Sequence, residues 1–386
     1  MHKPLFLLAA GLCLLAAAPG ALAQEGDRLI RIGVVEAAPS ATLGVTVPSA
    51  LFEGERMVAR FAASAPIVVT QASDSLEVSL PDGTTASARG PLRLRADAPS
   101  PEVRVSVAGK TYRGELEVRA GSGALAVVNE LGLEAYLYGV VPAEVIPSWH
   151  PEALKAQAVA ARTYAVAHMG QFNALGYDLK ATVVSQAYGG AKLERPSTNQ
   201  AVDETRGRIL TYLGKPIDAF YSDSSGGFTE SSQEVWGKAI PYLQPVPDFD
   251  QQSPRYVWEA TASAERSAQA LAKLGLSIGE LVNIEPLERS YSGRLKRARL
   301  TGTSGTAEVG GEKLRFAFGL RSTFFNVARA QDGTFAFAGR GWGHGVGMSQ
   351  WGAKAMADMG YSYDQILGHY YGQTTLSDGL LVKAPR

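Results

Sequence analysis

Glu144 is the residue whose type and surroundings point most clearly to chemistry. It lies in the segment GVVPAEVIPSWHPEALKAQAVAARTYA, residues 139–165. The side chains on either side of it are apolar: Val141, Val145, Ile146 and Trp149. Such neighbours partly desolvate a carboxyl group and raise its pKa, which keeps some of it protonated near neutral pH, as a general acid requires. The alternative is that Glu144 only caps the following helix or forms a salt bridge with it.

A strand, a turn and a helix are the elements expected to position this glutamate. The run LAVVNELGLEAYLYGVV contains many β-branched and aromatic residues and predicts a strand up to Val141. Pro142 ends that strand because proline cannot donate to a sheet ladder, so the glutamate is expected in a turn. Ser148 is the expected N-cap, and Pro151 a first-turn residue, of a helix from about residue 150 to 168.

The loop YSDSSGGFTESS, residues 221–232, carries residues suited to binding a sugar. Its short hydroxyl and carboxyl side chains surround two glycines that allow close backbone approach. The candidate substrate-binding residues here are Tyr221, Ser222, Ser224, Ser225, Gly226, Gly227, Thr229 and Glu230. A β-hairpin in GRILTYLGKPIDAFYS, with its turn at Gly214 and Lys215, is expected to lead into this loop. The alternative is a polar surface turn.

A second loop, AGRGWGHGVGMSQWGA at residues 338–353, has alternating glycines that allow positive φ and can aim N–H groups at a ligand. Its candidate substrate-binding residues are His344, Gly345, Gly347, Met348, Ser349 and Gln350. The alternative for His344 is a buried histidine that is hydrogen-bonded within a tight turn. Three aromatic residues could stack on sugar faces, although aromatic residues more often lie in a core: Trp342, Trp351 and Tyr370.

Other chemistries fit these motifs less well. A serine hydrolase would use Ser225 as nucleophile and His344 as base, but the G-x-S-x-G pattern is absent. Neither glycine-rich phosphate-binding motif fits the second loop. The histidines after residue 23 are His150, His168, His344 and His369, and they form no H-E-x-x-H pair. We therefore expect no metal ion and no cofactor.

Three segments resemble, in order, the signature blocks of the SpoIID/LytB family of peptidoglycan-acting proteins. The first is PAEVIPSWHPEALKAQAVAARTYAV, residues 142–166. The second is AFYSDSSGGFTESSQEVWGKAIPYLQPV, residues 219–246, and the third is GRGWGHGVGMSQWGAKAMADMGYSYDQILGHYY, residues 339–371. Some family members carry a Cys/His zinc cluster near the first block. This chain has one cysteine, Cys13, which lies in the expected signal segment, so the resemblance does not extend to that metal.

The resemblance implies two possible activities. In the sporulation branch of the family, the glutamate that matches Glu144 is catalytic in a lytic transglycosylase, which cleaves between N-acetylmuramic acid and N-acetylglucosamine and leaves 1,6-anhydro ends. One carboxyl group suffices for that route, whereas a hydrolase normally needs a second. The candidates for a second are Asp223, Glu230 and Glu234. The LytB branch implies instead a noncatalytic, glycan-binding enhancer of an N-acetylmuramoyl-L-alanine amidase.

The N-terminal segment and the composition indicate where the protein is located and which classes of partner it has. Residues 1–23 have a basic start, a short apolar core and an A-x-A end, the pattern of a cleaved secretory signal. We therefore expect a secreted protein in the periplasm or cell-wall space, with membrane contact only through an uncleaved signal segment. Lys plus Arg and Asp plus Glu both total 37, so no nucleic-acid partner is expected. The expected partners are peptidoglycan glycan strands and, for the alternative function, a cell-wall amidase.

The pattern of elements predicts an α+β fold, with a β-rich N-terminal scaffold followed by a mixed region of helices and antiparallel sheet. Residues 24–111 give short strands between Gly, Pro, Asp and Ser turns, and residues 112–386 form the SpoIID/LytB-like domain. A subdomain is expected at about residues 255–330. It contains helices near 263–274 and 312–320, with a hairpin across Ser292 and Gly293 between them.

Overall fold

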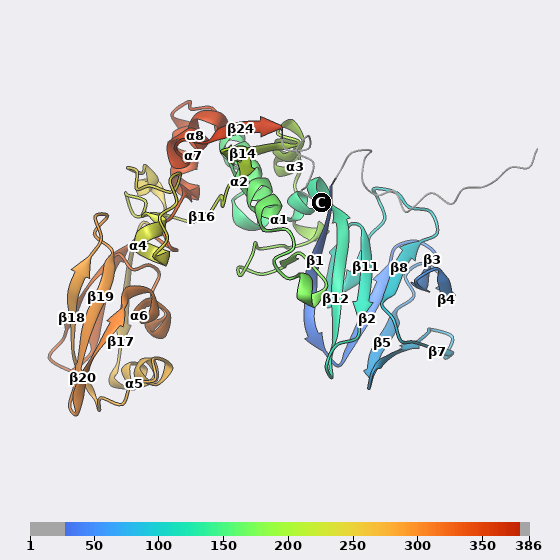
Figure 1. Cartoon of the computed structure of the whole chain (residues 1–386), viewed down its shortest axis with the longest axis horizontal. Helices are drawn as coiled ribbons and strands as arrows, with labels where there is room; N and C mark the ends of the chain where they lie inside the picture. The colour runs from blue at the N-terminus through green and yellow to red at the C-terminus, as the bar shows by residue number, and fades with distance from the viewer. Residues whose placement is uncertain (1–27, 379–386) are drawn as a thin grey trace, which may run out of the picture.

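The computed structural model describes residues 28–378, and the predicted signal segment lies outside them. Helices and mainly antiparallel sheets follow an N-terminal part made of strands, so the fold is α+β, as predicted. Figure 1 shows two β-rich parts on either side of a group of helices. Within the described residues, none of the helices combines the length and apolar character needed to cross a membrane.

Two sheets form the N-terminal part. Their strand orders are β13-β1-β12-β11-β8-β3-β4 and β10-β9-β2-β5-β6-β7. Both contribute to one hydrophobic core, with Ile32 and Leu94 from the first sheet and Leu43 and Val69 from the second. The strands are β1 (Leu29–Ala38), β2 (Ser40–Val45), β3 (Ser49–Glu53), β4 (Arg56–Phe61), β5 (Ile67–Ala72), β6 (Ser75–Ser79), β7 (Thr85–Ala88), β8 (Leu92–Ala96), β9 (Val105–Val107), β10 (Lys110–Tyr112), β11 (Glu115–Arg119), β12 (Leu125–Gly132) and β13 (Leu179–Lys180).

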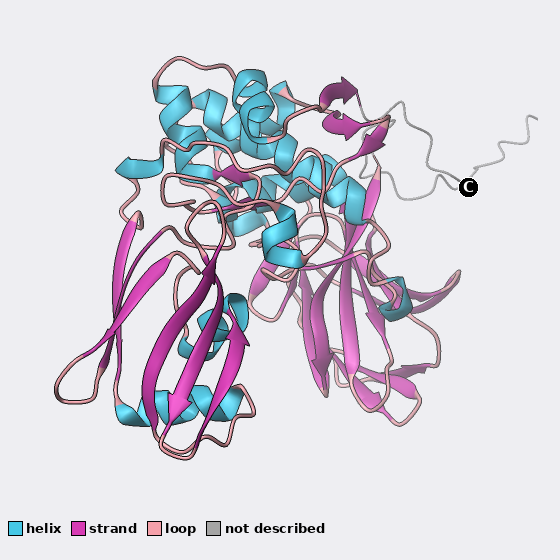
Figure 2. Ribbon diagram, turned by 60° about the vertical axis from the view of Figure 1, so that its left-hand side comes forward, coloured by secondary structure: helices cyan, strands magenta, loops and turns pink. Residues whose placement is uncertain are grey.

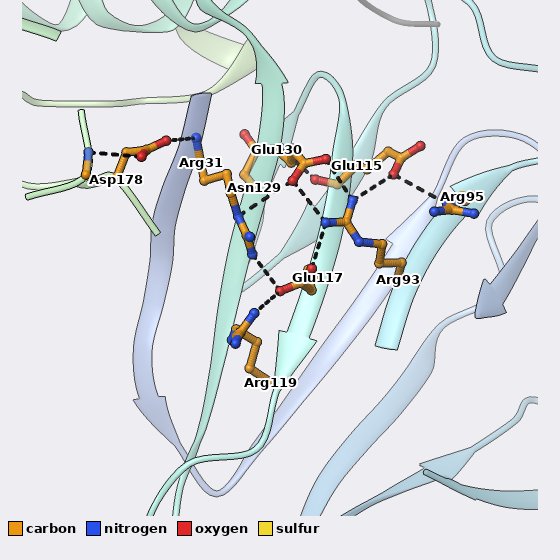
Figure 3. A network of polar contacts seen from close by, with 10 residues as sticks. Arg31, Arg93, Arg95, Glu115, Glu117, Arg119, Asn129, Glu130 and Asp178 are labelled. Carbon is orange, nitrogen blue, oxygen red and sulfur yellow. Dashed lines mark hydrogen bonds and ion pairs between the residues drawn. The ribbon is translucent and has the colours of Figure 1, made fainter. Parts of the chain in front are cut away.

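The face of the seven-stranded sheet opposite this core carries a ladder of arginines and glutamates (Figure 3). At its centre Glu117 contacts Arg31 at 2.6 Å, Arg93 at 2.9 Å and Arg119 at 2.6 Å. Burial acts to raise the pKa of Glu117, but the hydrogen bond from Arg119 and the charges of Arg31 and Arg93 outweigh it and lower that pKa. These ion pairs link β1, β8 and β11 across the sheet.

The segment that carries Glu144 is a helix, so the predicted strand is confirmed only from Leu125 to Gly132 and the predicted turn is wrong. Strand β12 ends at Gly132, and α1 follows directly from Leu133 to Glu144, with Pro142 inside it. Its buried apolar residues recur at helical spacing: Leu133, Tyr136, Leu137, Val140 and Val141. Pro142 is tolerated because it lies in the last turn, where it disturbs only the end of the helix.

The second helix confirms the sequence analysis except at its cap. α2 runs from Pro151 to His168, with proline in its first turn. Its N-cap is His150, which accepts a hydrogen bond from the Glu152 amide, and not Ser148 as predicted. The remaining elements that pack with α1 and α2 are α3 (Pro196–Glu204), α7 (Gln350–Asp358), α8 (Tyr363–Tyr370), β14 (Arg208–Tyr212), β15 (Lys215–Pro216) and β24 (Thr375–Asp378). Short 3-10 turns occur at Asn173–Leu175, Ala191–Leu193 and Asp250–Gln252.

The loop at residues 221–232 is called the Ser/Gly loop below. The predicted hairpin before it is confirmed, with a shift of one residue in its turn. β14 pairs with β15 through Tyr212 and Lys215, which leaves Leu213 and Gly214 as the turn. On its other edge β14 pairs with β24 near the C-terminus.

A second hydrophobic cluster, separate from the first, lies between Trp258 and Phe337. Its helices and central hairpin are those predicted, and its strands form two three-stranded sheets. Figure 2 shows these strands together with their helices. The elements are β17 (Val257–Ala262), α5 (Ala264–Lys273), β18 (Leu281–Arg289), β19 (Leu295–Gly302), β20 (Gly305–Gly310), α6 (Gly311–Phe318), β21 (Phe325–Arg329) and β22 (Phe335–Arg340). We call residues 257–340 the β-rich subdomain.

A buried ion pair joins α1 to α2. Arg162 Nε and Nη2 donate to the two carboxylate oxygens of Glu134 at 2.8 and 2.7 Å, and both side chains are 1% exposed. Arg162 also donates to the carbonyls of Val202 at 3.1 Å and Arg208 at 3.2 Å. One guanidinium therefore holds α1, the end of α3 and the start of β14 against α2.

Replacing Arg162 with Met should be strongly destabilising, because Glu134 would remain buried without a counter-ion. We expect a loss of about 3–5 kcal/mol in the free energy of unfolding, measured by urea denaturation. Arg297→Met is the matched control, because its ion pair with Glu308 is exposed and should be worth less than about 1 kcal/mol. Equal urea midpoints for the two variants would show that the buried pair does not hold the helices together.

Candidate active site

A pocket of about 640 Å³ lies where the helices meet the β-rich subdomain. The end of α1 contributes Glu144, and α6 contributes Glu312, Arg315 and Phe316. The two predicted loops both reach it, through residues 220–223 and 342–344. Segments far apart in the chain therefore form one concave site around Glu144.

Glu144 is half-buried and carries a raised pKa. Burial is the main cause, and it is partly opposed by the Ala187 amide, which donates to Oε1 at 2.9 Å, and by the side chains of Gln350 and Tyr221. Glu144 is also the last residue of α1, where the partial negative charge of the helix end disfavours a carboxylate. Both effects favour the protonated acid, which the sequence analysis expected from the apolar neighbours alone.

The Ala187 amide reaches Glu144 because a glycine in α1 lets the loop at residues 186–190 approach closely. The Gly189 amide donates to the Gly139 carbonyl at 3.1 Å. A Cβ atom on Gly139 would lie 2.6 Å from the ring of Tyr188, so a larger residue would push the loop away.

The Tyr221 hydroxyl is oriented by a buried glutamine. Gln186 Nε2 donates to the Tyr221 oxygen at 3.0 Å and to the Ala161 carbonyl at 3.2 Å, while its Oε1 accepts from the Tyr136 hydroxyl at 3.3 Å. Since Gln186 occupies an acceptor position of Tyr221, the phenolic hydrogen is left to donate toward Glu144. Neither Gln186 nor Ala187 was predicted, and no motif in the sequence distinguishes them.

The two predicted loops meet in a short parallel pairing. β16 (Tyr221–Ser222) pairs with β23 (Met348–Ser349), which places Tyr221 beside Met348 and Ser222 beside Ser349. Ser349 caps α7 by accepting from the Gly352 amide, and Gln350 follows as the first helical residue, close to Glu144. Ser222 lines the pocket, and its buried hydroxyl has no hydrogen-bond partner among the described residues.

His344 lines the pocket as a neutral imidazole. Burial, with the charges of Arg315 and Arg294, lowers its pKa to about 4. Its Nδ1 accepts from the Val346 amide at 3.0 Å, so the ring proton lies on Nε2. The ring centroids of His344 and Trp236 are 5.4 Å apart, which places both on one wall.

Most of the Ser/Gly loop is turned away from the pocket. Ser224 and Ser225 donate to buried Asp250 and Asp248, and Asp250 also accepts from the amides of the two glycines that follow, Gly226 and Gly227. Thr229 bonds the backbone of Val246. These residues therefore support the loop, and they do not line the pocket as substrate-binding residues would. A serine hydrolase is disfavoured for the same reason, because Ser225 is fully buried and bonded to Asp248.

The glycines of the second loop serve close packing. A Cβ on Gly345 would lie 2.2 Å from the Arg294 guanidinium, and one on Gly347 would lie 2.1 Å from the Phe220 carbonyl. Both have positive φ, so both the space and the backbone conformation require glycine. Gly345, Gly347 and Met348 are buried and do not line the pocket.

Of the three candidates for a second carboxyl group, Asp223 alone lines this pocket, and it is paired with Arg255 at 2.7 Å. Glu230 is buried elsewhere and accepts hydrogen bonds from Ser290 and Ser292. Glu234 pairs with Lys296 at 2.8 Å. Glu312, which the sequence analysis missed, also lines the pocket and is paired with Arg315 at 3.0 Å.

Aromatic side chains form an open wall of the pocket. Trp236 and Phe316 are 44% and 70% exposed, which leaves their faces free for a sugar, and neither was predicted. Trp342 was predicted and does line the pocket, with Arg321 4.0 Å from its ring centroid. Trp351 packs on Trp149 in the core with centroids 5.0 Å apart. The third predicted aromatic residue, Tyr370, is buried, and its hydroxyl donates to Asp248 at 2.6 Å.

Removing the Tyr221 hydroxyl should raise the pKa of Glu144 further, because that side chain acts to lower it. We expect the NMR titration of the Glu144 carboxyl carbon to move to higher pH in Tyr221→Phe, with Glu144→Gln to assign the signal. Tyr164→Phe is the control, since Tyr164 lines the same pocket but makes no hydrogen bond to Glu144. An unchanged midpoint in Tyr221→Phe would contradict the assigned hydrogen bond.

Comparisons with known proteins agree with the sequence blocks. Residues 121–212 match the SpoIID family model, described as stage II sporulation protein, and residues 242–347 match a domain of unknown function, DUF8618. The chain is 36% identical over 273 residues to the Stage II sporulation protein D of Bacillus amyloliquefaciens, covering 65% of this chain and 76% of that protein.

Two further relatives show similar identity. The Amidase enhancer of Bacillus subtilis (strain 168) is 32% identical over 339 residues, covering 74% of this chain but 47%, about half, of its own length. An uncharacterized protein of Brachyspira hyodysenteriae is 35% identical over 274 residues, covering 70% of this chain and 73% of that protein. The chain therefore belongs to the SpoIID/LytB family, as shown by the family model, the extent of these alignments and the three signature blocks in its sequence.

Proposed function

We propose that the chain is a lytic transglycosylase that cleaves peptidoglycan between N-acetylmuramic acid and N-acetylglucosamine. The observation that carries this proposal is the state of Glu144, a carboxyl group with a raised pKa at the end of a helix in a pocket with an aromatic wall. The other described carboxyl groups of that pocket, Asp223 and Glu312, are each paired with an arginine. Glu144 is thus the group suited to give up a proton.

In the first step Glu144 acts as the acid. Its Oε1 is engaged by the Ala187 amide, so we assign the proton to Oε2. That proton passes to the glycosidic oxygen of the N-acetylglucosamine leaving group while the bond from this oxygen to C1 of the muramoyl residue breaks. The transition state has oxocarbenium character, and the exposed faces of Trp236 and Phe316 are placed to stack on the sugar rings that carry it.

In the second step Glu144 acts as the base. It removes the proton from the C6 hydroxyl of the muramoyl residue as that oxygen bonds to C1, which closes the 1,6-anhydro ring. The proton that Glu144 gave up is thereby restored, and no water is consumed. Because the substrate supplies the nucleophile, Asp223 can remain paired with Arg255 throughout the cycle.

A second candidate function is a noncatalytic, glycan-binding enhancer of an N-acetylmuramoyl-L-alanine amidase. The printed name of the Bacillus subtilis relative, Amidase enhancer, favours it. In that case the same pocket would bind glycan, Glu144 would hold a sugar hydroxyl, and an amidase would be the partner. For either function we propose that the protein acts outside the cytoplasm, in the periplasm or cell-wall space, where the glycan strands lie.

Glu144→Gln should lower the rate of glycan cleavage by about 10² to 10⁴, the usual contribution of a general acid or base. The measurement is mass spectrometry of glycan strands, with and without stem peptides, after incubation with the mature protein. Anhydro-muramoyl ends made by the wild type and not by Glu144→Gln are the expected result. Asp223→Asn is the matched control, and it should retain most of the activity.

Other glycan products would indicate a function different from a lytic transglycosylase. Reducing ends in place of anhydro ends, lost in Asp223→Asn, would indicate hydrolysis with two carboxyl groups. No new ends from the wild type, together with faster release of stem peptides by an added amidase, would replace the proposed activity with the enhancer function. A fully active Glu144→Gln that remains folded would remove Glu144 from the mechanism.

The rate should also fall as the pH rises through the pKa of Glu144, since the first step requires the protonated acid. Because burial raises that pKa, activity should persist to higher pH than an exposed glutamate would allow. Tyr221→Phe should shift this alkaline limb of the kcat/KM profile upward, provided that the variant is active. A pH profile with no alkaline limb would contradict the assignment of the acid.

A further inference from the structure

Four exposed apolar side chains gather on the active-site pocket, and the proposed mechanism uses only two of them. Those two, Trp236 and Phe316, form its aromatic wall. Val183 and Val184 line the same pocket and are 90% and 61% exposed. Single exposed apolar residues are ordinary on a protein surface, whereas a group of them at one concave site is typical of a place that binds apolar parts of a ligand.

The two valines occupy the corner of a turn. The Ser185 amide donates to the Thr182 carbonyl at 2.9 Å, which closes a four-residue turn with Val183 and Val184 at its centre. Turn corners usually carry glycine, proline, asparagine, aspartate or serine, so the turn itself does not require two β-branched apolar residues. We call residues 182–185 the apolar turn.

The apolar turn belongs to the segment that positions the acid. On its N-terminal side, the Lys180 amide donates to Ser185 Oγ at 3.2 Å, which ties the turn to the end of β13. On its C-terminal side, Gln186 and Ala187 follow directly, and the Ala187 amide donates to Glu144 at 2.9 Å. One short segment therefore places both the two valines and a hydrogen bond to the acid.

The two aromatic side chains are supported by neighbours. Trp236 ends α4 (Ser232–Trp236), and its ring packs on Phe220 with centroids 4.6 Å apart. Phe316 lies in α6, and Arg315 Cζ is 5.1 Å from its ring centroid. Each ring is thus held by a neighbouring side chain while part of it stays exposed at the pocket.

The charges of the pocket favour a neutral ligand. Asp223 and Glu312 each have an arginine partner, so Glu144 is the carboxyl group without a cation among the described residues that line the pocket. A positive group on the ligand would be attracted to Glu144, and its charge would favour the carboxylate over the acid. A neutral apolar substituent leaves the acid protonated.

We propose that the apolar turn, Trp236 and Phe316 bind the methyl groups of acetamido substituents, so that the site selects N-acetylated glycan strands over strands with free amino groups. The inference rests on the proposed function, because it takes a peptidoglycan strand as the ligand of this pocket. Each sugar of an unmodified strand carries an acetamido group, which is neutral and ends in a methyl group. Loss of the acetyl group removes that methyl and leaves an ammonium group near Glu144.

The test measures binding by calorimetry to the mature chain carrying Glu144→Gln, which prevents turnover. The probes are three muramoyl tetrasaccharides without stem peptides, whose amino groups are all acetylated, all formylated or all free. A formyl group keeps the neutral amide and lacks only the methyl group, and the lactyl methyl groups are the same in all three probes. The acetylated probe should bind about fourfold more tightly than the formylated one for each methyl group that the pocket covers.

Two further comparisons separate the apolar contact from charge. The probe with free amino groups should bind at least about tenfold more weakly than the acetylated probe at a pH where those groups are protonated, since it loses the methyl contact and must also desolvate a charge. The preference for acetyl over formyl should not change with salt, because neither group is charged.

Three variants locate the effect. The double variant Val183→Ser, Val184→Ser should reduce the preference for acetyl over formyl to less than about twofold, and so should Phe316→Ser. Serine suits a turn corner, so the double variant should unfold at the same temperature as its parent. Leu213→Ser is the matched control and should keep the full preference, because Leu213 is 85% exposed in the turn between β14 and β15 and does not line the pocket.

Equal binding of the acetylated and formylated probes would overturn this inference, and so would a full preference retained in the double valine variant. Neither result affects the proposed function, which depends on anhydro ends made by the wild type. A preference that follows the variants, from a wild type that makes no new ends, would keep the acetamido site and remove the transglycosylase activity. Failure of all three probes to bind would contradict both proposals.

Discussion

The buried pair of Arg162 and Glu134 fixes the position on which the site depends. It locks the start of α1 against α2, and α1 then carries Glu144 at its far end, about ten residues or 15 Å along the axis. Because a helix is rigid over this length, the anchored first turn determines where the carboxyl group lies. The same arginine holds the strand that leads toward β16, so one contact orients both Glu144 and Tyr221.

Charge is distributed around the pocket so that one carboxyl group is left without a cation. Asp223 and Glu312 have arginine partners, and Asp248 and Asp250 lie beneath the Ser/Gly loop, where they bond its hydroxyls and amides. Glu144 receives an amide and two polar side chains, none of which carries a positive charge. An acid in such surroundings stays protonated more readily than its paired neighbours.

The sequence predicted the fold class, α2, and the helices and central hairpin of residues 257–340, because clear helical periodicity and turn residues mark them. It failed at α1, where β-branched and aromatic residues suggested a strand, although the apolar spacing from Leu133 to Val141 fits a helix equally well. In the Ser/Gly loop, composition suggested sugar contacts. Most of those side chains are instead buried and form hydrogen bonds within the protein. Gln186 could not be found, since its role depends on a contact between segments distant in the chain.

The parallel pairing of β16 with β23 makes the site around Glu144 depend on segments that are far apart in the sequence. Gln350 and the cap of α7 come from the last tenth of the sequence, whereas Glu144 comes from its first half. During synthesis, the site around Glu144 therefore stays incomplete until almost the whole chain has emerged and docked. Contacts of such long sequence separation form late in folding. A chain cut short before residue 348 would keep the residues that line the pocket but would lack the strand that pairs with β16 and the Gln350 side chain beside Glu144.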